Sequence, residues 1–217
     1  MRLLDLFCGA GGSAVGYYRA GFTEIVGVDL ALMPRYPFGF VQGDALEFLR
    51  SVKPGEYDLI HCSPPCQAYS VCRHTTCSDR VYPDLVGPTR DLLLQTGTPW
   101  VIENVVGAPL KDPVALCGVM FGLKVFRHRL FETSEFILQL PHPHHRSRRI
   151  GFDGFCCVAG HGDGGKRTRV DRYHRRKDAW QSAMGITWMT KPELTQAIPP
   201  AFTEWLGTQM ISTLETP

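Results

Sequence analysis

The opening of the chain constrains the fold more than any other part of the sequence. An apolar run, Arg2–Phe7, leads into the glycine-rich segment Cys8-Gly-Ala-Gly-Gly12 and a helix-forming stretch that closes at Gly21. A second apolar run, Glu24–Asp29, follows and ends in an acid. Strand, glycine-rich turn, helix and strand form the βαβ unit of a parallel sheet. We therefore expect an α/β fold.

The glycine-rich turn and the acid behind it favour a nucleoside-type cofactor. Glycines let the backbone approach a ligand at a helix N-terminus, and Ser13 can cap the helix expected over Ala14–Ala20. Asp29 lies about twenty residues past the start of the turn, where a carboxylate can bond ribose hydroxyls. The turn is neither G-x-G-x-x-G nor a G-K-[ST] phosphate loop. A tight structural turn is the alternative.

Three further apolar runs extend this pattern into a larger sheet. Phe40–Asp44, Tyr57–Cys62 and Pro99–Val105 are predicted as the third, fourth and fifth strands. The whole is predicted to be Rossmann-like, with a mostly parallel sheet and helices on both faces. Ligands bind beyond the carboxyl ends of the strands in such sheets. We expect the glycine-rich turn, Asp29, Asp44 and the loop after the fourth strand to share one crevice.

Asp44 is open to two interpretations. Its carboxylate can cap a helix expected over Ala45–Val52. It can also accept a hydrogen bond from the exocyclic amine of a cofactor base. The sequence does not decide between them.

The segment Cys62-Ser-Pro-Pro-Cys-Gln-Ala-Tyr-Ser70 puts a thiol on a stiff loop at a strand end. Proline fixes φ and lacks an N–H, so Pro64 and Pro65 restrict the loop that carries Cys66. A thiol is a nucleophile only as the thiolate, and a stiff loop keeps it aimed. A structural turn with a passenger cysteine is the alternative, since free cysteine often behaves as a small buried hydrophobe.

Further along the chain, charged groups suit proton transfer and anion binding. Glu103 lies in an apolar strand, where burial can raise a carboxyl pKa and hold a proton near neutrality; a strand-end salt bridge is the alternative. Val114–Gly122 is predicted as a short helix and Lys124–Phe131 as an edge strand or hairpin. On that strand Arg127 and Arg129 would share one face and suit phosphate or a carbonyl oxygen, unless the edge is simply solvated.

Charge is spread unevenly along the chain. The net charge is +2, yet residues 144–177 contain ten Lys or Arg and three Asp, a local charge of +7. The rest of the chain has a net charge of −5. Such a basic segment favours a polyanionic partner, and a solvated basic loop is the alternative.

Hydropathy and cysteine content indicate where the protein works. No stretch of eighteen apolar residues is present, so no membrane span is expected. The N-terminus lacks a cleavable signal pattern. We expect a cytoplasmic protein whose eight cysteines are free, catalytic or metal-bound rather than paired in disulfides.

Residues 136–177 are predicted to be an irregular, loop-rich insertion. Basic residues alternate with Phe152, Phe155 and Tyr173, a composition that suits nucleic-acid contacts. The cysteines and histidines here and near Cys66 match no standard zinc spacing, so no metal is expected. The sets considered were Cys62, Cys66, Cys72 and Cys77, and His142, His144, His145, Cys156, Cys157 and His161.

The end of the chain returns to a helical pattern. Helices are predicted over Ala179–Met184, Glu193–Ala197 and Ala201–Leu214, with Asp178, Pro192 and Pro199-Pro200 at their starts. The apolar stripe of the last helix is expected to pack on the first domain. The predicted units are therefore residues 1–135, the insertion 136–177, and the returning helices 178–217.

Outside residues 136–177, these segments together resemble the cytosine-5 DNA methyltransferase family. Asp5-Leu-Phe-Cys-Gly-Ala-Gly-Gly12 is similar to its S-adenosylmethionine loop, Pro65-Cys66-Gln67 with Ser70 to its nucleophile motif, and Glu103-Asn104-Val105 and Arg127-x-Arg129 to two further motifs. The resemblance implies S-adenosylmethionine as cofactor and double-stranded DNA as partner. The implied cofactor-binding residues are Asp5, Phe7, Gly9, Gly11, Gly12, Asp29, Leu30, Asp44 and Pro64.

The resemblance also implies a mechanism. Cys66 would attack C6 of a flipped-out cytosine, Glu103 would hold a proton against N3, and Arg129 would bind O2. Arg127 would contact the base or its phosphate, and residues 136–177 would be a target-recognition region that grips DNA. The implied substrate-binding residues are Gln67, Ser70, Asn104, Arg146, Arg148, Arg149, Arg172 and Arg175.

The chain departs from the family pattern at three places. Val125 stands where a Gln is usual, and Asp29-Leu30 stands where Glu and an aromatic residue are usual. Gln196-Ala-Ile-Pro-Pro200 replaces a Gly-Asn pair that braces the cofactor. The recognition region is short, which implies a short or relaxed target sequence.

Three alternatives are compatible with the same residues. The first is an RNA cytosine methyltransferase of the transfer-RNA type, and the second transfers a modified group from a derivative of S-adenosylmethionine. The third is an inactive member that only binds DNA or a partner methyltransferase. We expect a monomeric enzyme of bacterial or phage type, of the kind found in restriction–modification systems.

Overall fold

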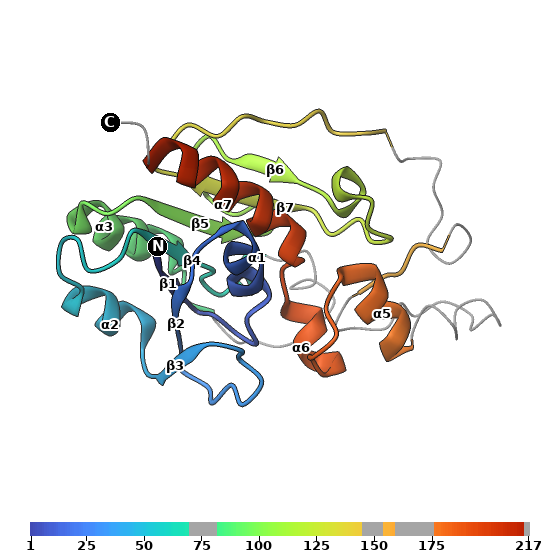
Figure 1. The fold of residues 1–217 in the computed structure, drawn as a ribbon, viewed down its shortest axis with the longest axis horizontal. Helices are drawn as coiled ribbons and strands as arrows, with labels where there is room; N and C mark the ends of the chain where they lie inside the picture. The colour runs from blue at the N-terminus through green and yellow to red at the C-terminus, as the bar shows by residue number, and fades with distance from the viewer. Residues whose placement is uncertain (70–81, 145–153, 159–175, 215–217) are drawn as a thin grey trace.

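A seven-stranded sheet forms the centre of the computed structural model, which describes residues 1–69, 82–144, 154–158 and 176–214 (Figure 1). The strand order is β3-β2-β1-β4-β5-β7-β6. The strands are β1 (Arg2–Leu6), β2 (Glu24–Asp29), β3 (Gly39–Gln42), β4 (Leu59–Cys62), β5 (Trp100–Asn104), β6 (Val114–Leu116) and β7 (Arg129–Thr133).

Five neighbouring strands of this sheet are parallel. β1 pairs with β2 and β4 in parallel, β2 with β3, and β4 with β5. β7 is antiparallel to both β5 and β6. The expected mostly parallel sheet is confirmed, and each of the five predicted strands is present, β2 with the predicted ends and the other four with slightly different ones.

Helices cover both faces of the sheet (Figure 1). Because side chains alternate along a strand, Leu3 and Val101 face one way and pack with α1 (Gly12–Ala20) and α7 (Pro200–Leu214). The next residues along the strands, such as Leu4, face the other way and pack with α2 (Ala45–Ser51) and α3 (Val86–Thr96). The result is a three-layer α/β/α arrangement.

Local capping explains where several helices begin. Oδ1 of Asp44 accepts the backbone N–H groups of Leu46 and Glu47 at 2.8 and 2.9 Å, so the cap predicted for α2 is confirmed. The cap predicted for Ser13 is wrong. Gly11 occupies that position in a left-handed conformation, and the Ser13 hydroxyl donates instead to Asp5 at 3.3 Å.

Residues 114–133 differ most from the sequence prediction. The expected helix over Val114–Gly122 is replaced by β6 and a 3₁₀ helix, η2 (Gly118–Phe121). β7 lies between β5 and β6 rather than at an edge, and it begins only at Arg129. Arg127 precedes the strand and has a φ of 26°, so strand periodicity does not apply to it.

A second, smaller core lies next to the main one. α5 (Lys177–Met184) and α6 (Lys191–Gln196) pack Trp180 and Leu194 against Val125, Val158 and Ala10. This places the small core against the turn after β1. The predicted domain limits at 135 and 177 stay a prediction.

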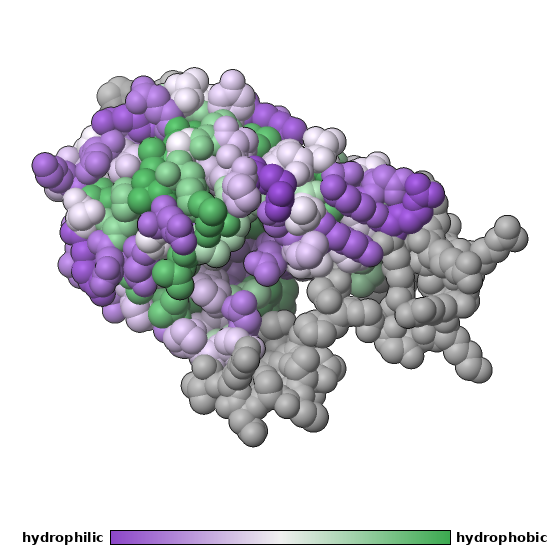
Figure 2. All heavy atoms as spheres, turned by 90° about the horizontal axis from the view of Figure 1, so that it is seen from below, coloured by the Kyte–Doolittle hydropathy of each residue, from purple (hydrophilic) through white to green (hydrophobic). Residues whose placement is uncertain are grey.

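The described surface is mixed in polarity. Seen from below, it shows a green apolar area bordered by purple polar atoms (Figure 2). Large exposed apolar side chains near β2 and β3 include Leu30, Leu32 and Val41. No helix in the described part of the chain is long and apolar enough to cross a membrane.

Candidate functional site

The candidate site lies at the carboxyl edge of the parallel strands. The paired positions Leu6 and Cys62, and Cys62 and Ile102, bring the ends of β1, β4 and β5 level with one another. The turn Cys8–Gly12 (the glycine loop), the loop after Cys62 and the end of β5 therefore leave the sheet side by side. This is the edge at which open α/β sheets bind ligands.

The glycine loop is held open by unusual backbone angles. Phe7, Gly9 and Gly11 all have positive φ, at 56°, 50° and 81°. The backbone N–H of Gly9 donates to Oδ2 of Asp29 at 3.0 Å, and a Cβ added at Gly9 would meet no atom within 4 Å. The loop thus presents open space beside Asp29.

The side chain of Asp5, near the end of β1 before the glycine loop, points into the protein and does not face solvent. It is fully buried, and its carboxylate accepts hydrogen bonds from Tyr36 at 3.2 Å and Ser13 at 3.3 Å. Burial raises the pKa of Asp5 well above its usual range, although these two hydrogen bonds oppose the rise. Because its side chain is fully buried, Asp5 links Ser13 of α1 to Tyr36 beneath the glycine loop, and its predicted contact with the cofactor stays a prediction.

The C-terminal part of the chain braces the glycine loop. A Cβ at Gly12 would lie 2.4 Å from the carbonyl oxygen of Ile198, so only glycine allows this close approach. Nε1 of Trp188 donates to the carbonyl oxygen of Ala10 at 2.8 Å. Sequence reasoning missed Trp188, because a single tryptophan between two helices carries no spacing signal.

The remaining predicted cofactor residues lie around this loop. Oδ1 of Asp29 accepts the N–H of Ala31 at 3.0 Å, so both of its oxygens already have backbone partners. Leu30 is exposed, with 73% of its surface accessible. Asp44 is exposed at the start of α2, and Pro64 is buried in the loop after β4.

Asn104 fastens the loop that carries Cys66. Its Nδ2 donates to the carbonyl oxygen of Pro64 at 2.9 Å, and its Oδ1 accepts the N–H of Val105 at 2.9 Å. Cys66 is partly exposed and Gln67 is exposed. The amide of Asn104, predicted to touch substrate, is thus engaged with the protein backbone.

Glu103 and Arg129 form a nearly buried ion pair beside Cys66. Nε of Arg129 lies 2.8 Å from Oε1 of Glu103, and 6% of Glu103 is accessible. Burial raises the pKa of Glu103, although Arg129, Arg127 and a hydrogen bond with Ser63 oppose the rise. This environment favours a carboxyl group that holds a proton more readily than an exposed one.

The same charges act on the thiol. Burial raises the pKa of Cys66, the charge on Arg129 opposes the rise, and the charge on Glu103 adds to it. Cys66, Glu103 and Arg129 therefore come from three segments into one electrostatic unit. Their catalytic roles stay a prediction.

Arg127 has a different position from the one predicted. Its Nη1 donates to the carbonyl oxygen of Val158 at 3.0 Å and its Nη2 to that of Thr195 at 2.7 Å. Burial lowers its pKa well below the usual range. Arg127 thus joins the start of β7 to two segments of the small core, and the prediction that it shares a strand face with Arg129 is wrong.

A buried chain of polar groups, missed from the sequence, leads from α1 to Glu103. Nδ1 of His61 lies 3.1 Å from the hydroxyl of Tyr17, and Nε2 lies 3.0 Å from Oγ of Ser63. Ser63 in turn bonds Glu103. Burial lowers the pKa of His61 to about 3, so the ring is neutral near pH 7 and has one N–H to donate.

Several predicted residues lie outside the described part of the chain. These are Ser70, Arg146, Arg148, Arg149, Arg172 and Arg175, and Cys72, Cys77, His145 and His161 from the metal sets.

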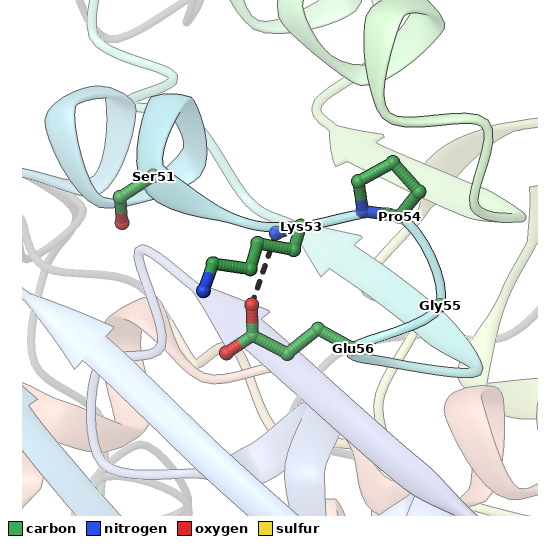
Figure 3. Close-up of a pocket in the computed structure, with 5 residues that line it drawn as sticks. All are labelled: Ser51, Lys53, Pro54, Gly55 and Glu56. Carbon is green, nitrogen blue, oxygen red and sulfur yellow. Dashed lines mark hydrogen bonds between the residues drawn. The ribbon is translucent and has the colours of Figure 1, made fainter.

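An open hollow elsewhere on the surface is unrelated to this site. It is lined by Ser51, Lys53, Pro54, Gly55 and Glu56, and the N–H of Lys53 donates to Glu56 at 3.0 Å (Figure 3). The hollow lies in the loop that precedes β4, at the amino edge of the sheet. No predicted site residue lines it.

Comparison with known families identifies the chain's relatives. The sequence model of the C-5 cytosine-specific DNA methylase family matches residues 1–112. The chain belongs to this family. The match covers the glycine loop, Asp29, Cys66 and Glu103, and it ends before Arg127 and Arg129.

Two curated relatives match parts of the chain. Type II methyltransferase M.AgeI of Thalassovita gelatinovora is 28% identical over 124 residues, which cover 49% of this chain and 28% of that protein. Type II methyltransferase M.AquIA of Picosynechococcus is 35% identical over 86 residues, which cover 32% of this chain and 34% of that protein. The chain thus spans about a third or less of these relatives.

Solved structures support the fold over the whole chain. A candidate DNA modification methyltransferase encoded within a prophage of E. coli has a TM-score of 0.61 at 14% identity, with all of both chains covered. The S. pombe Dnmt2 methyltransferase also has a TM-score of 0.61, at 11% identity and 99% coverage of both chains. At such identities the likeness concerns the fold alone.

Proposed function

We propose that the protein transfers a methyl group from S-adenosylmethionine to C5 of cytosine in double-stranded DNA. The observation that carries this proposal is the meeting of Cys66, Glu103 and Arg129 beside the glycine loop. A nucleophile, a proton-holding carboxyl and a guanidinium are the groups that activation of a cytosine ring requires. Membership of the C-5 cytosine-specific DNA methylase family points to the same chemistry.

The residues around the glycine loop fit the methyl donor. Open space at Gly9 suits the methionine part, because no side chain competes for it. Asp29 would face the ribose and Asp44 the adenine amine, while exposed Leu30 and Phe7 would cover the adenine ring. When bound, S-adenosylmethionine supplies an electrophilic methyl group.

The protein's own residues would activate the ring in steps. The thiolate of Cys66 forms a bond to C6, Glu103 holds its proton at N3, and electron density moves to C5. Arg129 stabilises the charge that develops at O2. After methyl transfer a base removes the C5 proton, the bond between Cys66 and C6 breaks, and the ring regains its double bond.

The target cytosine must leave the duplex for these groups to reach it. Glu103 is buried and Cys66 is only partly exposed at the carboxyl edge of the sheet, whereas C5 and C6 are shielded inside stacked DNA. The basic segment 144–177 would hold the phosphate backbone during this step. The names of the two Type II methyltransferase relatives support a place for the protein in a restriction–modification system.

A trapping experiment tests the proposal. Duplex DNA and transfer RNA that contain 5-fluorocytosine are offered separately, with and without S-adenosylmethionine, to wild type, Cys66→Ala and Glu103→Gln. Fluorine blocks the final elimination, so we expect a covalent complex with DNA that needs the cofactor and is lost in Cys66→Ala. Glu103→Gln should slow complex formation by about 10²-fold or more.

Other outcomes would redirect the assignment. A complex with RNA alone would place the protein with RNA cytosine methyltransferases. The absence of a complex with either substrate, across DNA of varied sequence, would favour an inactive binding protein.

A further inference from the structure

The side chains of Cys117, His128 and His142 come from separate segments and meet near the start of β7. The Sγ of Cys117 and ring nitrogens of His128 and His142 all lie within 4.8 Å of one another. Cys117 starts η2, His128 directly precedes β7, and His142 follows in the segment after β7. Cysteine and histidine are the side chains that zinc prefers.

The two imidazoles already have a spacing close to that of metal ligands. Their Nε2 atoms are 3.0 Å apart, and the rings stack with centroids separated by 5.1 Å and an angle of 26°. Two nitrogen ligands about 2.0–2.1 Å from a tetrahedral zinc ion would lie about 3.3 Å apart. A shift of a few tenths of an ångström would bring the two nitrogens to this separation.

The turn around Cys117 fixes the position of its side chain. The N–H of Cys117 donates to Sδ of Met120 at 3.2 Å, and the N–H of Met120 donates to the carbonyl oxygen of Cys117 at 2.9 Å. These bonds hold the turn that places Sγ within 4.8 Å of the two imidazole nitrogens, and the deprotonated thiol is the form that binds metal. Cys117 is fully buried, so the ion would be shielded on that side.

We propose that Cys117, His128 and His142 bind a zinc ion. One thiolate and two imidazoles leave a fourth tetrahedral position for water or a further side chain. The ion would tie η2, the start of β7 and the segment after β7 into one unit. His128 stands between Arg127 and Arg129, so the ion would position both guanidiniums without touching substrate.

The spacing of these residues explains why the sequence gives no zinc signal. Cys117 and His128 are eleven residues apart and His142 is fourteen further on, without the paired short spacing of zinc fingers. Only the antiparallel pairing of β6 with β7 brings Cys117 next to His128. The group of possible metal ligands considered from the sequence included His142 but neither Cys117 nor His128.

Metal content of purified, reduced protein tests this site without any substrate. We expect zinc equimolar with wild-type chains, after zinc addition and removal of excess, and a loss of most of it in Cys117→Ser, His128→Asn and His142→Asn. His144→Asn and Cys157→Ser are the matched controls and should keep it, because they belong only to the alternative cluster. Circular dichroism checks that each variant is folded, and exposed His142 offers a variant with little risk to the core.

Substitution with cobalt supplies a second measurement, which identifies the cysteine that binds the metal. Wild type loaded with Co²⁺ should show a thiolate-to-cobalt charge-transfer band, and Cys117→Ser should lose it while Cys157→Ser retains it. Reduced wild type that binds neither metal would overturn the proposal. Loss of metal in the Cys157 and His144 variants, with metal retained in the Cys117 and His128 variants, would also overturn it. None of these outcomes depends on methyl transfer.

Discussion

Arg129 and Glu103 act on the Cys66 thiol with opposite signs, because one carries a positive and the other a negative charge beside it. The family mechanism needs both a thiolate and a protonated carboxyl in one small volume. The charge on Arg129 also opposes the rise that burial causes in the pKa of Glu103. The balance at this site can therefore be measured one residue at a time.

Paired variants should move the reactivity of Cys66 in opposite directions. Arg129→Gln removes the charge that opposes the raised pKa, so alkylation of Cys66 should require higher pH. Glu103→Gln removes a negative charge that raises the pKa of Cys66 further, so alkylation of the thiol should occur at lower pH. Peptide mapping after iodoacetamide treatment across pH gives both profiles. A shift of both variants in the same direction would contradict this electrostatic account.

His61 should make stability depend on pH in a defined window. Burial lowers its pKa to about 3, whereas the unfolded chain has an ordinary histidine. Between these values the unfolded state binds the additional proton, so stability falls as pH drops from about 6.5 toward 3. The contribution is at most about 1.4 kcal/mol per pH unit.

The variant His61→Gln isolates this contribution from those of buried carboxyls. Asp5 and Glu103 have raised pKa values, so their contributions have the opposite sign and remain in both proteins. Urea unfolding of wild type and variant from pH 7 to 4 should give a shallower pH dependence for the variant. Equal slopes would show that His61 titrates normally.

At the level of elements, the contact of α1 with α7 depends on small residues. A Cβ at Gly16 would lie 2.0 Å from Oγ1 of Thr203 and 2.2 Å from the carbonyl oxygen of Pro200. Gly16→Ala should lower the free energy of unfolding by about 1–3 kcal/mol through overpacking. Gly87→Ala in α3 is the matched control, since its Cβ meets nothing within 4 Å and should be neutral or stabilising by up to about 1 kcal/mol. Chemical denaturation of both variants makes the comparison.

The brace from Trp188 should affect cofactor binding more than folding. Trp188→Phe keeps a ring but removes the N–H that binds Ala10, which is worth about 0.5–1.5 kcal/mol. We expect the Kd for S-adenosylmethionine to rise by roughly two- to tenfold in calorimetry. Trp205→Phe, in the other core cluster next to Phe121, should leave it unchanged. An unchanged Kd in Trp188→Phe would show that this hydrogen bond does not contribute to cofactor binding.

At the scale of the whole molecule, the basic segment should determine the salt dependence of DNA binding. Replacing Arg146, Arg148 and Arg149 by Gln should weaken binding to all DNA sequences and reduce the slope of log K against log salt by about 0.9 per lost phosphate contact. A charge-matched control changes Arg19 in α1, Arg50 in α2 and Lys53 just after α2, which are all exposed. Equal slopes for the two triple variants would exclude a special role for the basic segment.

Features that depend on residues close together in the sequence were predicted correctly, and features that depend on distant partners were missed. The β1 and β2 runs and the Asp44 cap were predictable, because each depends on neighbours within a few residues. Residues 114–133 were not, because β6 is too short to show periodicity and exists only through pairing with β7. His61 and Trp188 were also missed, since their partners are 44 and 178 residues away.

The glycine loop near the start of the chain is completed by Trp188 and Ile198 near its other end. During synthesis the ribosome adds Trp188 178 residues after Ala10, so β1 and the glycine loop emerge well before their brace. A nascent chain halted before residue 188 would hold the methyl donor poorly, even with Cys66 and Glu103 already made. The order of synthesis thus delays completion of the glycine loop's surroundings until residues 188 and 198 have emerged.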